Sequence, residues 1–141
     1  MTESKEAAGK VASRVFKNEV FQNPGLVLFP GGKSPIPFYK ELAHNMMNWN
    51  NISIMATDDR VVPLDNIYSN TGMIQRELFG RISTSSKPQL IKVFPEHGLN
   101  TLDALVAIEW KLKNDFPKIA FLGMGSDGHT AGIFGKYNTE Q

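Results

Sequence analysis

The chain has 141 residues, 41% of them hydrophobic and 21% charged, which predicts one globular domain with a real core. With 15 basic and 14 acidic residues the net charge is +1, so nothing general favours binding to nucleic acid or an anionic membrane. The sequence has no cysteine, which excludes disulfides, zinc–thiolate sites and cysteine nucleophiles. No segment resembles a signal peptide or a membrane span, so we expect a cytoplasmic protein.

Helices and strands are predicted to alternate along the chain. Amphipathic segments with apolar residues three and four positions apart predict helices, and short continuous apolar runs predict strands buried on both faces. The expected elements are, in order, a helix over 8–16, a strand at 26–29, a helix from Pro35, a strand at 52–56, a helix after Ser69, a strand at 90–94, a helix from Thr101 and a strand at 119–124.

Turn and cap residues mark where these elements begin and end. Asn23, Pro24 and Gly25 end the first helix. Ser34 is expected to cap the second helix with Pro35 in its first position, and Ser69 is expected to cap the third. The last helix carries a stripe of apolar residues at helical spacing, which are Leu105, Ile108, Leu112 and Phe116.

This alternation predicts an α/β fold, a doubly wound parallel sheet with helices on both faces. Ligands of such sheets bind beyond the carboxyl ends of the strands. The loops after the first, second and fourth strands are the most polar and glycine-rich of the chain, and all of them are expected at that edge.

The loop after the first strand contains Gly31, Gly32, Lys33 and Ser34. Two glycines allow close approach of a ligand to the backbone, and the following helix would present unpaired amides, a lysine charge and a hydroxyl to a phosphate. The alternative is a tight turn with a serine cap, and this loop alone does not decide between the two.

The loop after the second strand begins with Asp58, Asp59 and Arg60. Arginine suits a phosphate or a developing oxyanion because its planar guanidinium donates several hydrogen bonds. An adjacent aspartate could position a hydroxyl or tune a base. The alternative is a solvated charge cluster.

The loop after the fourth strand, residues 123–129, matches G-x-G-x-x-G and contains Asp127 and His129. A dinucleotide site is disfavoured, because that fingerprint normally opens the first βαβ unit. His129 follows a carboxylate by two residues and could take a proton from water. His44 in a helix and His97 in a polar turn are expected to be structural, and the spacing disfavours a metal site.

Three segments together resemble the 6-phosphogluconolactonase family. "GMGSDGHTAGIFG" resembles its G-x-G-x-D-G-H-T-A-S-L-F-P signature, "TDDRVVPLDNIYSN" its D-E-R-x-V-P…S-N segment, and "FPGGKSPIPFYKEL" its G-G-S-T-P-x-x-x-Y-x-x-L loop. Their order and spacing agree, and the resemblance covers nearly the whole chain. It implies the fold shared with glucosamine-6-phosphate deaminases, ribose-5-phosphate isomerase and CoA transferases.

The resemblance also implies a reaction, the hydrolysis of 6-phospho-D-glucono-1,5-lactone to 6-phosphogluconate in the pentose phosphate pathway, without metal or organic cofactor. By the same resemblance His129 is the general base, and Asp58 is the catalytic aspartate beside the substrate. The residues expected to bind the substrate are Gly31, Gly32, Lys33, Ser34, Arg60, Gly125, Asp127, Gly128 and Thr130.

Two features favour the lactonase over the related deaminases. Deaminases usually carry a glutamate five residues after the histidine, where this chain has Phe134, and D-E-Y where it has Asp58-Asp59-Arg60. The chain also departs from the lactonase pattern. Asp59 replaces a glutamate, Lys33 a small hydroxyl residue, Gly132 a serine and Gly135 a proline.

Family members continue well past this histidine loop, so we expect residues 1–141 to be a single α/β domain, the N-terminal portion of the lactonase fold, truncated after the fourth strand. Phosphate binding would then be incomplete, and an exposed sheet edge would favour self-association. The alternative function is a non-catalytic or weakly active sugar-phosphate-binding module.

Overall fold

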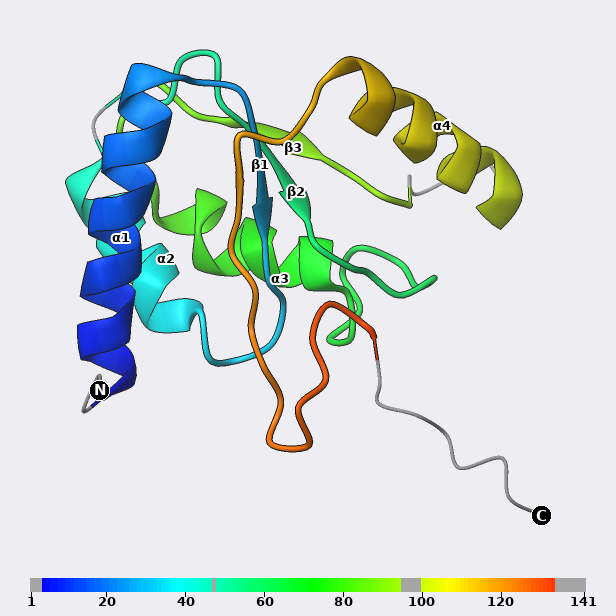
Figure 1. Ribbon diagram of the computed structural model, residues 1–141, viewed down its shortest axis with the longest axis horizontal. Helices are drawn as coiled ribbons and strands as arrows, with labels where there is room; N and C mark the ends of the chain where they lie inside the picture. Colours follow the sequence, from blue (N-terminus) through cyan, green and yellow to red (C-terminus); the bar gives the residue numbers. More distant parts are fainter. Residues whose placement is uncertain (1–3, 47, 95–99, 134–141) are drawn as a thin grey trace.

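The arrangement of strands and helices follows the predicted alternation. The computed structural model describes residues 4–46, 48–94 and 100–133, and its strands run parallel in the order β3-β2-β1-β4 (Figure 1). The strands are β1 (Leu26–Phe29), β2 (Ser53–Ala56), β3 (Gln89–Ile91) and β4 (Ile119–Ala120). The helices are α1 (Lys5–Gln22), α2 (Ile36–Asn45), α3 (Asn70–Glu77), the 3-10 helix η1 (Phe79–Arg81) and α4 (Thr101–Asn114). The predicted parallel α/β fold is confirmed.

The central strand is β1, which pairs with a strand on each side. Val27 is in register with Ile54 of β2 and with Ile119 of β4. Three of the four residues of β1 are buried, as expected for a strand covered on both faces. The continuous apolar run at 26–29 therefore predicted both the limits and the burial of this strand.

The last strand is shorter than the apolar run that predicts it. The sequence predicts a strand over 119–124, but β4 ends at Ala120, and one further ladder bond runs from the Phe121 amide to the carbonyl of Leu28 (2.9 Å). The reason lies in the neighbouring strand. β1 ends at Phe29, and the following Pro30 has no N–H to donate, so the pairing stops there.

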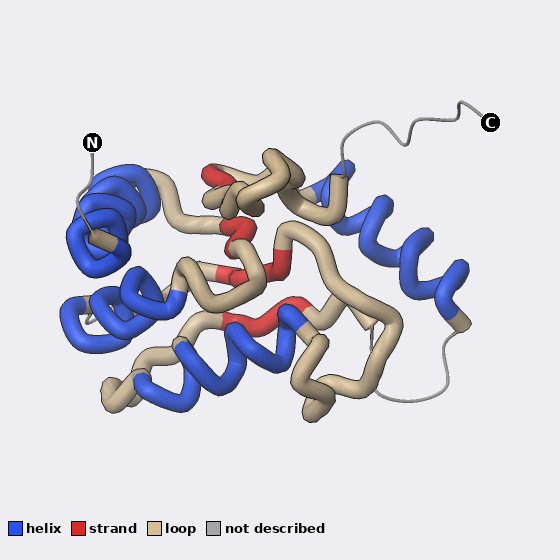
Figure 2. The backbone as a smooth tube through the Cα atoms, turned by 90° about the horizontal axis from the view of Figure 1, so that it is seen from below, coloured by secondary structure: helices blue, strands red, loops and turns tan. Residues whose placement is uncertain are grey.

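Helices lie on both sides of the sheet. Figure 2 shows α1, α2 and α3 on one side of the strands and α4 on the other. This places the crossover from β3 to β4 on the face opposite the other helices, which makes the sheet doubly wound, as predicted.

The main core lies between the sheet and the pair α1–α2. Its centre is a cluster of phenylalanine rings from separate elements, with centroids 5.6 Å apart for Phe16 and Phe29, 5.2 Å for Phe29 and Phe38, and 4.8 Å for Phe38 and Phe121. Tilted and edge-to-face pairs of this kind are favourable beyond the area they bury. Phe121 follows β4 directly, so this cluster fixes the base of the loop that carries His129.

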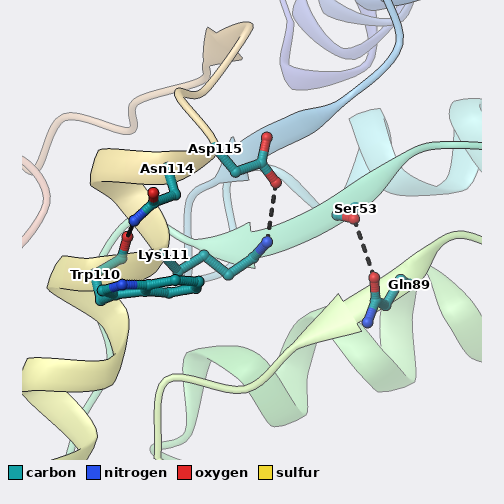
Figure 3. Close-up of polar contacts among 6 residues, drawn as sticks. All are labelled: Ser53, Gln89, Trp110, Lys111, Asn114 and Asp115. Atoms are coloured by element: carbon teal, nitrogen blue, oxygen red, sulfur yellow. Dashed lines mark hydrogen bonds and ion pairs between the residues drawn. The ribbon is translucent and has the colours of Figure 1, made fainter.

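Helix α4 forms where it is predicted, but its apolar stripe is not buried. Leu105 is 49% exposed, and Ala104 is the buried residue of the helix. Phe116, which the sequence assigns to the stripe, lies beyond the end of α4 at Asn114 and is 80% exposed. Polar contacts close its C-terminal end, where Lys111 binds Asp115 at 2.9 Å (Figure 3). None of the helices in the described ranges is long and apolar enough to cross a bilayer.

The start of α2 also differs from the prediction. The N-cap is Pro35 rather than Ser34, its backbone is already helical (φ −80°, ψ −5°), and no side chain caps the first turn. Pro37 in that turn lacks an N–H, so one amide fewer needs a partner. By contrast, Ser69 caps α3 as predicted, accepting a hydrogen bond from the Gly72 amide at 2.9 Å.

Candidate active site

A cleft of about 220 Å³ opens where the strand order reverses, at the carboxyl ends of β1 and β4. Open α/β sheets bind ligands at this point because the helices that follow the two strands lie on opposite faces and leave a crevice between the loops. The cleft is lined by the loops after β1, β2 and β4, so the structure brings together the three segments that the sequence singles out.

The loop after β1 contributes Pro30, Gly31, Gly32, Lys33 and Ser34 to the lining. Tyr39 of α2 holds this loop in place, because its buried hydroxyl donates a hydrogen bond to the carbonyl of Pro30 (2.5 Å). Burial raises the pKa of Tyr39 well above its ordinary value, because the phenolate form would lose its hydration. The tyrosine is therefore a neutral donor.

The two adjacent aspartates after β2 have different surroundings. The carboxylate of Asp59 points to the N-terminus of α3, where it accepts hydrogen bonds from the amides of Asn70 (2.8 Å) and Thr71 (3.0 Å) and from the Thr71 hydroxyl. These amides are among those that a helix leaves without an internal partner. Asp59 does not line the cleft, and its carboxylate instead caps the N-terminus of α3.

Asp58, in contrast, lines the cleft. Its Oδ1 accepts a hydrogen bond from the Thr57 hydroxyl (3.1 Å), and its Oδ2 lies 3.4 Å from Nδ2 of Asn70. A side-chain carbon on Gly132 would stand 3.5 Å from Oδ2, so the carboxylate lies beside the loop that carries His129.

Arg60 is exposed and lines the same cleft. Its Nη1 donates to the carbonyl of Tyr68 (2.8 Å), which braces the guanidinium against the far end of the loop. Together with Lys33 it brings two positive charges to a cleft that also holds the Asp58 carboxylate. This combination suits a ligand that carries both an anionic group and hydroxyls.

The loop after β4 folds back on itself around His129. Nδ1 of His129 and Oδ1 of Asp127 form a short hydrogen bond, and the Gly125 amide donates to the His129 carbonyl (2.9 Å). The pKa of Asp127 is lowered, chiefly by the hydrogen bond from the His129 side chain and then by the one from its backbone. An ionised carboxylate only accepts, so Nδ1 donates, and Nε2 is the ring nitrogen that can take a proton.

Close approach of backbone and ring makes Gly125 necessary in this loop. A Cβ at this position would overlap the His129 ring and crowd the Asp127 carboxylate. Six residues of the loop line the cleft, namely Gly123, Met124, Gly125, His129, Ala131 and Gly132.

Three residues expected to touch the substrate do not line the cleft, namely Asp127, Gly128 and Thr130. Each makes contacts that hold the loop in shape. Asp127 binds His129, the Gly128 amide donates to Gly125 (3.0 Å), and the Thr130 hydroxyl donates to the Gly123 carbonyl (2.8 Å). A role of these three in substrate binding stays a prediction.

The lining also includes residues that the sequence did not single out, among them Thr57, Asn70 and Met124. The sequence did contain an indication for Asn70, since it directly follows the helix cap Ser69 and belongs to the segment that resembles the family motif. His97, Phe134 and Gly135 lie outside the described residues. Among the residues described, no three histidine or acidic side chains gather closely enough to hold a metal ion.

Comparison with known proteins agrees with the fold. The sequence model of the family "Glucosamine-6-phosphate isomerases/6-phosphogluconolactonase" matches residues 3–141. A 6-phosphogluconolactonase of Neisseria meningitidis is 35% identical over 138 residues, covering 93% of this chain and 58% of the relative. One from Pseudomonas putida is 30% identical, covering 90% and 52%. The chain therefore spans little more than half the length of these relatives.

Solved structures give the same result. A 6-phosphogluconolactonase from Thermotoga maritima superposes with a TM-score of 0.72 at 29% identity, covering 90% of this chain and 60% of that one. A monomeric glucosamine-6-phosphate deaminase shares the fold, with a TM-score of 0.74 at 19% identity over 91% of this chain and 55% of that one. The chain belongs to the glucosamine-6-phosphate isomerase/6-phosphogluconolactonase family.

Proposed function

We propose that this chain acts in the hydrolysis of 6-phospho-D-glucono-1,5-lactone to 6-phosphogluconate, the lactonase step of the pentose phosphate pathway. The observation that carries the proposal is the common lining of one cleft by His129, Asp58 and Arg60, next to a glycine-rich loop. The two relatives named above, which are 30% and 35% identical to this chain over the matched region, are 6-phosphogluconolactonases, which supports the choice of reaction.

In this mechanism His129 is the general base. Nε2 takes a proton from a water molecule as the water oxygen attacks C1 of the lactone, and a tetrahedral intermediate forms. The C1–O5 bond then breaks, and the imidazolium returns the proton to the ring oxygen, which becomes the C5 hydroxyl of the product. Asp127 supports this cycle, since its carboxylate accepts the hydrogen bond from Nδ1 and so fixes the tautomer in which Nε2 is the base.

Binding in this proposal depends on the positive side of the cleft. Arg60 and Lys33 would hold the phosphate and the developing oxyanion, and the glycine-rich loop before α2 would admit the phosphate close to the backbone. Asp58 would accept a hydrogen bond from a sugar hydroxyl. A lactone is an activated ester, so a positioned water, a base and an anion clamp are sufficient without a covalent nucleophile.

The decisive measurement is lactone hydrolysis with freshly prepared 6-phosphogluconolactone, followed above the spontaneous rate. We expect acceleration by the chain and its loss in His129→Ala. The matched control is His44→Ala, which removes an exposed histidine from the last turn of α2, away from the cleft. Equal rates for the chain, for His129→Ala and for buffer would contradict the proposal.

The second candidate function is a sugar-phosphate-binding module without turnover. It is favoured by the same cationic lining, and it predicts that 6-phosphogluconate raises the melting temperature while hydrolysis stays at the spontaneous rate. A deaminase-like isomerase would instead act on glucosamine 6-phosphate, and release of ammonia would identify it.

Self-association through the sheet edge at β4 stays a prediction, as does the cytoplasmic location. β4 is an edge strand of the described sheet, and exposed apolar residues lie on α4 (Trp110), between α4 and β4 (Phe116) and after β4 (Leu122). Unpaired strand edges and apolar patches favour association. Sedimentation velocity that gives a monomer at every concentration would contradict it.

A further inference from the structure

The side chain of Asn70 lies between two loops of the cleft. It is 6% exposed, although it lines the cleft, and its Nδ2 donates a hydrogen bond to the carbonyl of Asp58 (2.9 Å). The same nitrogen lies 3.4 Å from Oδ2 of the Asp58 carboxylate. The backbone amide of Asn70 is held by Asp59 (2.8 Å), so the first residue of α3 is fixed to the loop after β2 through main chain and side chain.

On its other side Asn70 contacts the loop after β1. A Cβ on Gly31 would overlap the oxygen, carbon and nitrogen of the Asn70 amide group. Only glycine fits at position 31 while the amide is in place. Asn70 therefore sets how closely the two loops approach each other.

These contacts act on one carboxylate. The Thr57 hydroxyl donates to Oδ1 of Asp58, and the Asn70 amide stands at Oδ2, so each carboxylate oxygen has a protein donor. A carboxylate held in this way keeps one orientation before a ligand arrives, and that orientation costs nothing at the moment of binding. Because the Asn70 amide is neutral, it orients the Asp58 carboxylate and leaves its negative charge in place.

We propose that Asn70 is a positioning residue, which holds the Asp58 carboxylate in the cleft by locking the loop after β2 against Gly31. This inference rests on the proposed function, in which Asp58 contacts the sugar. It differs from that proposal because Asn70 acts through Asp58 and needs no contact with the substrate.

The test is a double-mutant cycle on kcat and KM with the lactone. We expect Asn70→Ala to lower kcat about 10- to 100-fold with a smaller change in KM, as for a misplaced reacting group. The loss should disappear in the Asp58→Ala background, because a residue that acts only through Asp58 has nothing left to position. Additive losses would overturn the proposal.

The matched control is Asn100→Ala, which removes an asparagine that does not line the cleft and whose Oδ1 caps α4 by accepting a hydrogen bond from the Asp103 amide (2.9 Å). We expect a lower melting temperature with unchanged kcat and KM. A kcat loss equal to that of Asn70→Ala would show that general destabilisation explains both, which would overturn the proposal.

Gly31→Ala gives a second route that keeps the amide but displaces it. We expect a similar fall in kcat, and no further fall when Gly31→Ala is added to Asn70→Ala, because the shorter side chain leaves room for the new methyl group. Gly80→Ala is the matched glycine control, since a Cβ there would meet its nearest neighbour, the Gln75 carbonyl, at an ordinary 3.6 Å. Unchanged kcat in Gly31→Ala would overturn the proposal.

A ligand-free measurement separates this inference from the proposed function. The ¹³Cγ resonance of Asp58 should shift in Asn70→Ala and in Gly31→Ala, and should stay in place in Asn100→Ala and Gly80→Ala. If the chain proves inactive, the proposed function fails while this shift still supports the positioning role. An Asp58 resonance that does not respond to Asn70→Ala overturns the positioning role, whatever the activity.

Discussion

The carboxylate of Asp59 binds the backbone amide and the hydroxyl of Thr71, and it thereby closes the N-terminus of α3 beneath the cleft. The same carboxylate also accepts hydrogen bonds from the amides of Arg60 and Asn70, both at 2.8 Å. One side chain thus ties the loop after β2 to the helix that follows it. Stability rather than binding is the property that this residue should control.

Replacing Asp59 by alanine should lower the free energy of unfolding by about 1–2 kcal/mol, the usual cost of removing a helix-capping side chain. Asp65→Ala is the control, because it removes an exposed aspartate from the same loop and should change stability by less than about 0.5 kcal/mol. Urea unfolding of both variants measures the difference. Equal stabilities of the two variants would show that the contacts at α3 contribute nothing.

Tyr39→Phe should lower the free energy of unfolding by about 1–2 kcal/mol, since it removes a buried hydrogen bond and leaves the Pro30 carbonyl without its donor. The control is Tyr68→Phe, which removes the hydroxyl of an exposed tyrosine and should lower the free energy of unfolding by less than about 0.5 kcal/mol. Thermal and urea melts measure both. A Tyr39→Phe protein as stable as the parent would contradict the anchoring role of this hydroxyl.

The pair of Asp127 and His129 predicts a pH dependence with a definite sign. The pKa of Asp127 is lowered from its ordinary 3.8, so its ionised form stabilises the fold above that pH, and this contribution is lost as the pH falls through the folded-state pKa. Asp127→Asn should therefore be less stable than the parent near neutrality, and the gap should close in acid. Melting curves over a pH series measure the gap, and a gap that widens on acidification would contradict the assignment.

Arg60→Ala should weaken the binding of 6-phosphogluconate roughly tenfold or more, because a charge-assisted hydrogen bond contributes about 1.5–3 kcal/mol. Arg60→Lys should restore only part of this, since an ammonium cannot reproduce the planar pair of donors. Arg76→Ala removes an exposed arginine of α3 outside the cleft and serves as control. Calorimetric titration that gives the same affinity for Arg60→Ala and Arg76→Ala would remove Arg60 from the binding site.

Local sequence patterns were enough to predict the strand at 26–29 and the convergence of three loops. Apolar runs report burial directly, and parallel strands must end at a common edge. The length of β4 could not be predicted in this way, because it is limited by Pro30, which directly follows the neighbouring strand β1 and is far away in the sequence. The exposed stripe of α4 is a similar case, since helical spacing predicts an apolar face but not what covers it.

The candidate site shows the same division. Asp58 and Asp59 are adjacent and chemically identical, and only the direction of the backbone sends one carboxylate to the cleft and the other to α3. Asn70 enters the site through its contact with Gly31 and the Asp58 carbonyl, and both partners are distant in sequence. Residue type and motif therefore identify the chemistry, while its geometry depends on contacts made by folding.

The position of β4 beside β1 has a consequence for how the protein folds. During synthesis the segments of β1, β2 and β3 leave the ribosome with their connecting helices before β4 exists, and neighbours in the sequence can pair early because short loops close at low entropic cost. Pairing of β4 with β1 closes the longest loop of the sheet and brings His129 to Asp58. The cleft is therefore completed by the last of the four described strands to be made, and a nascent chain that has not reached residue 119 carries the loops after β1 and β2 without the base.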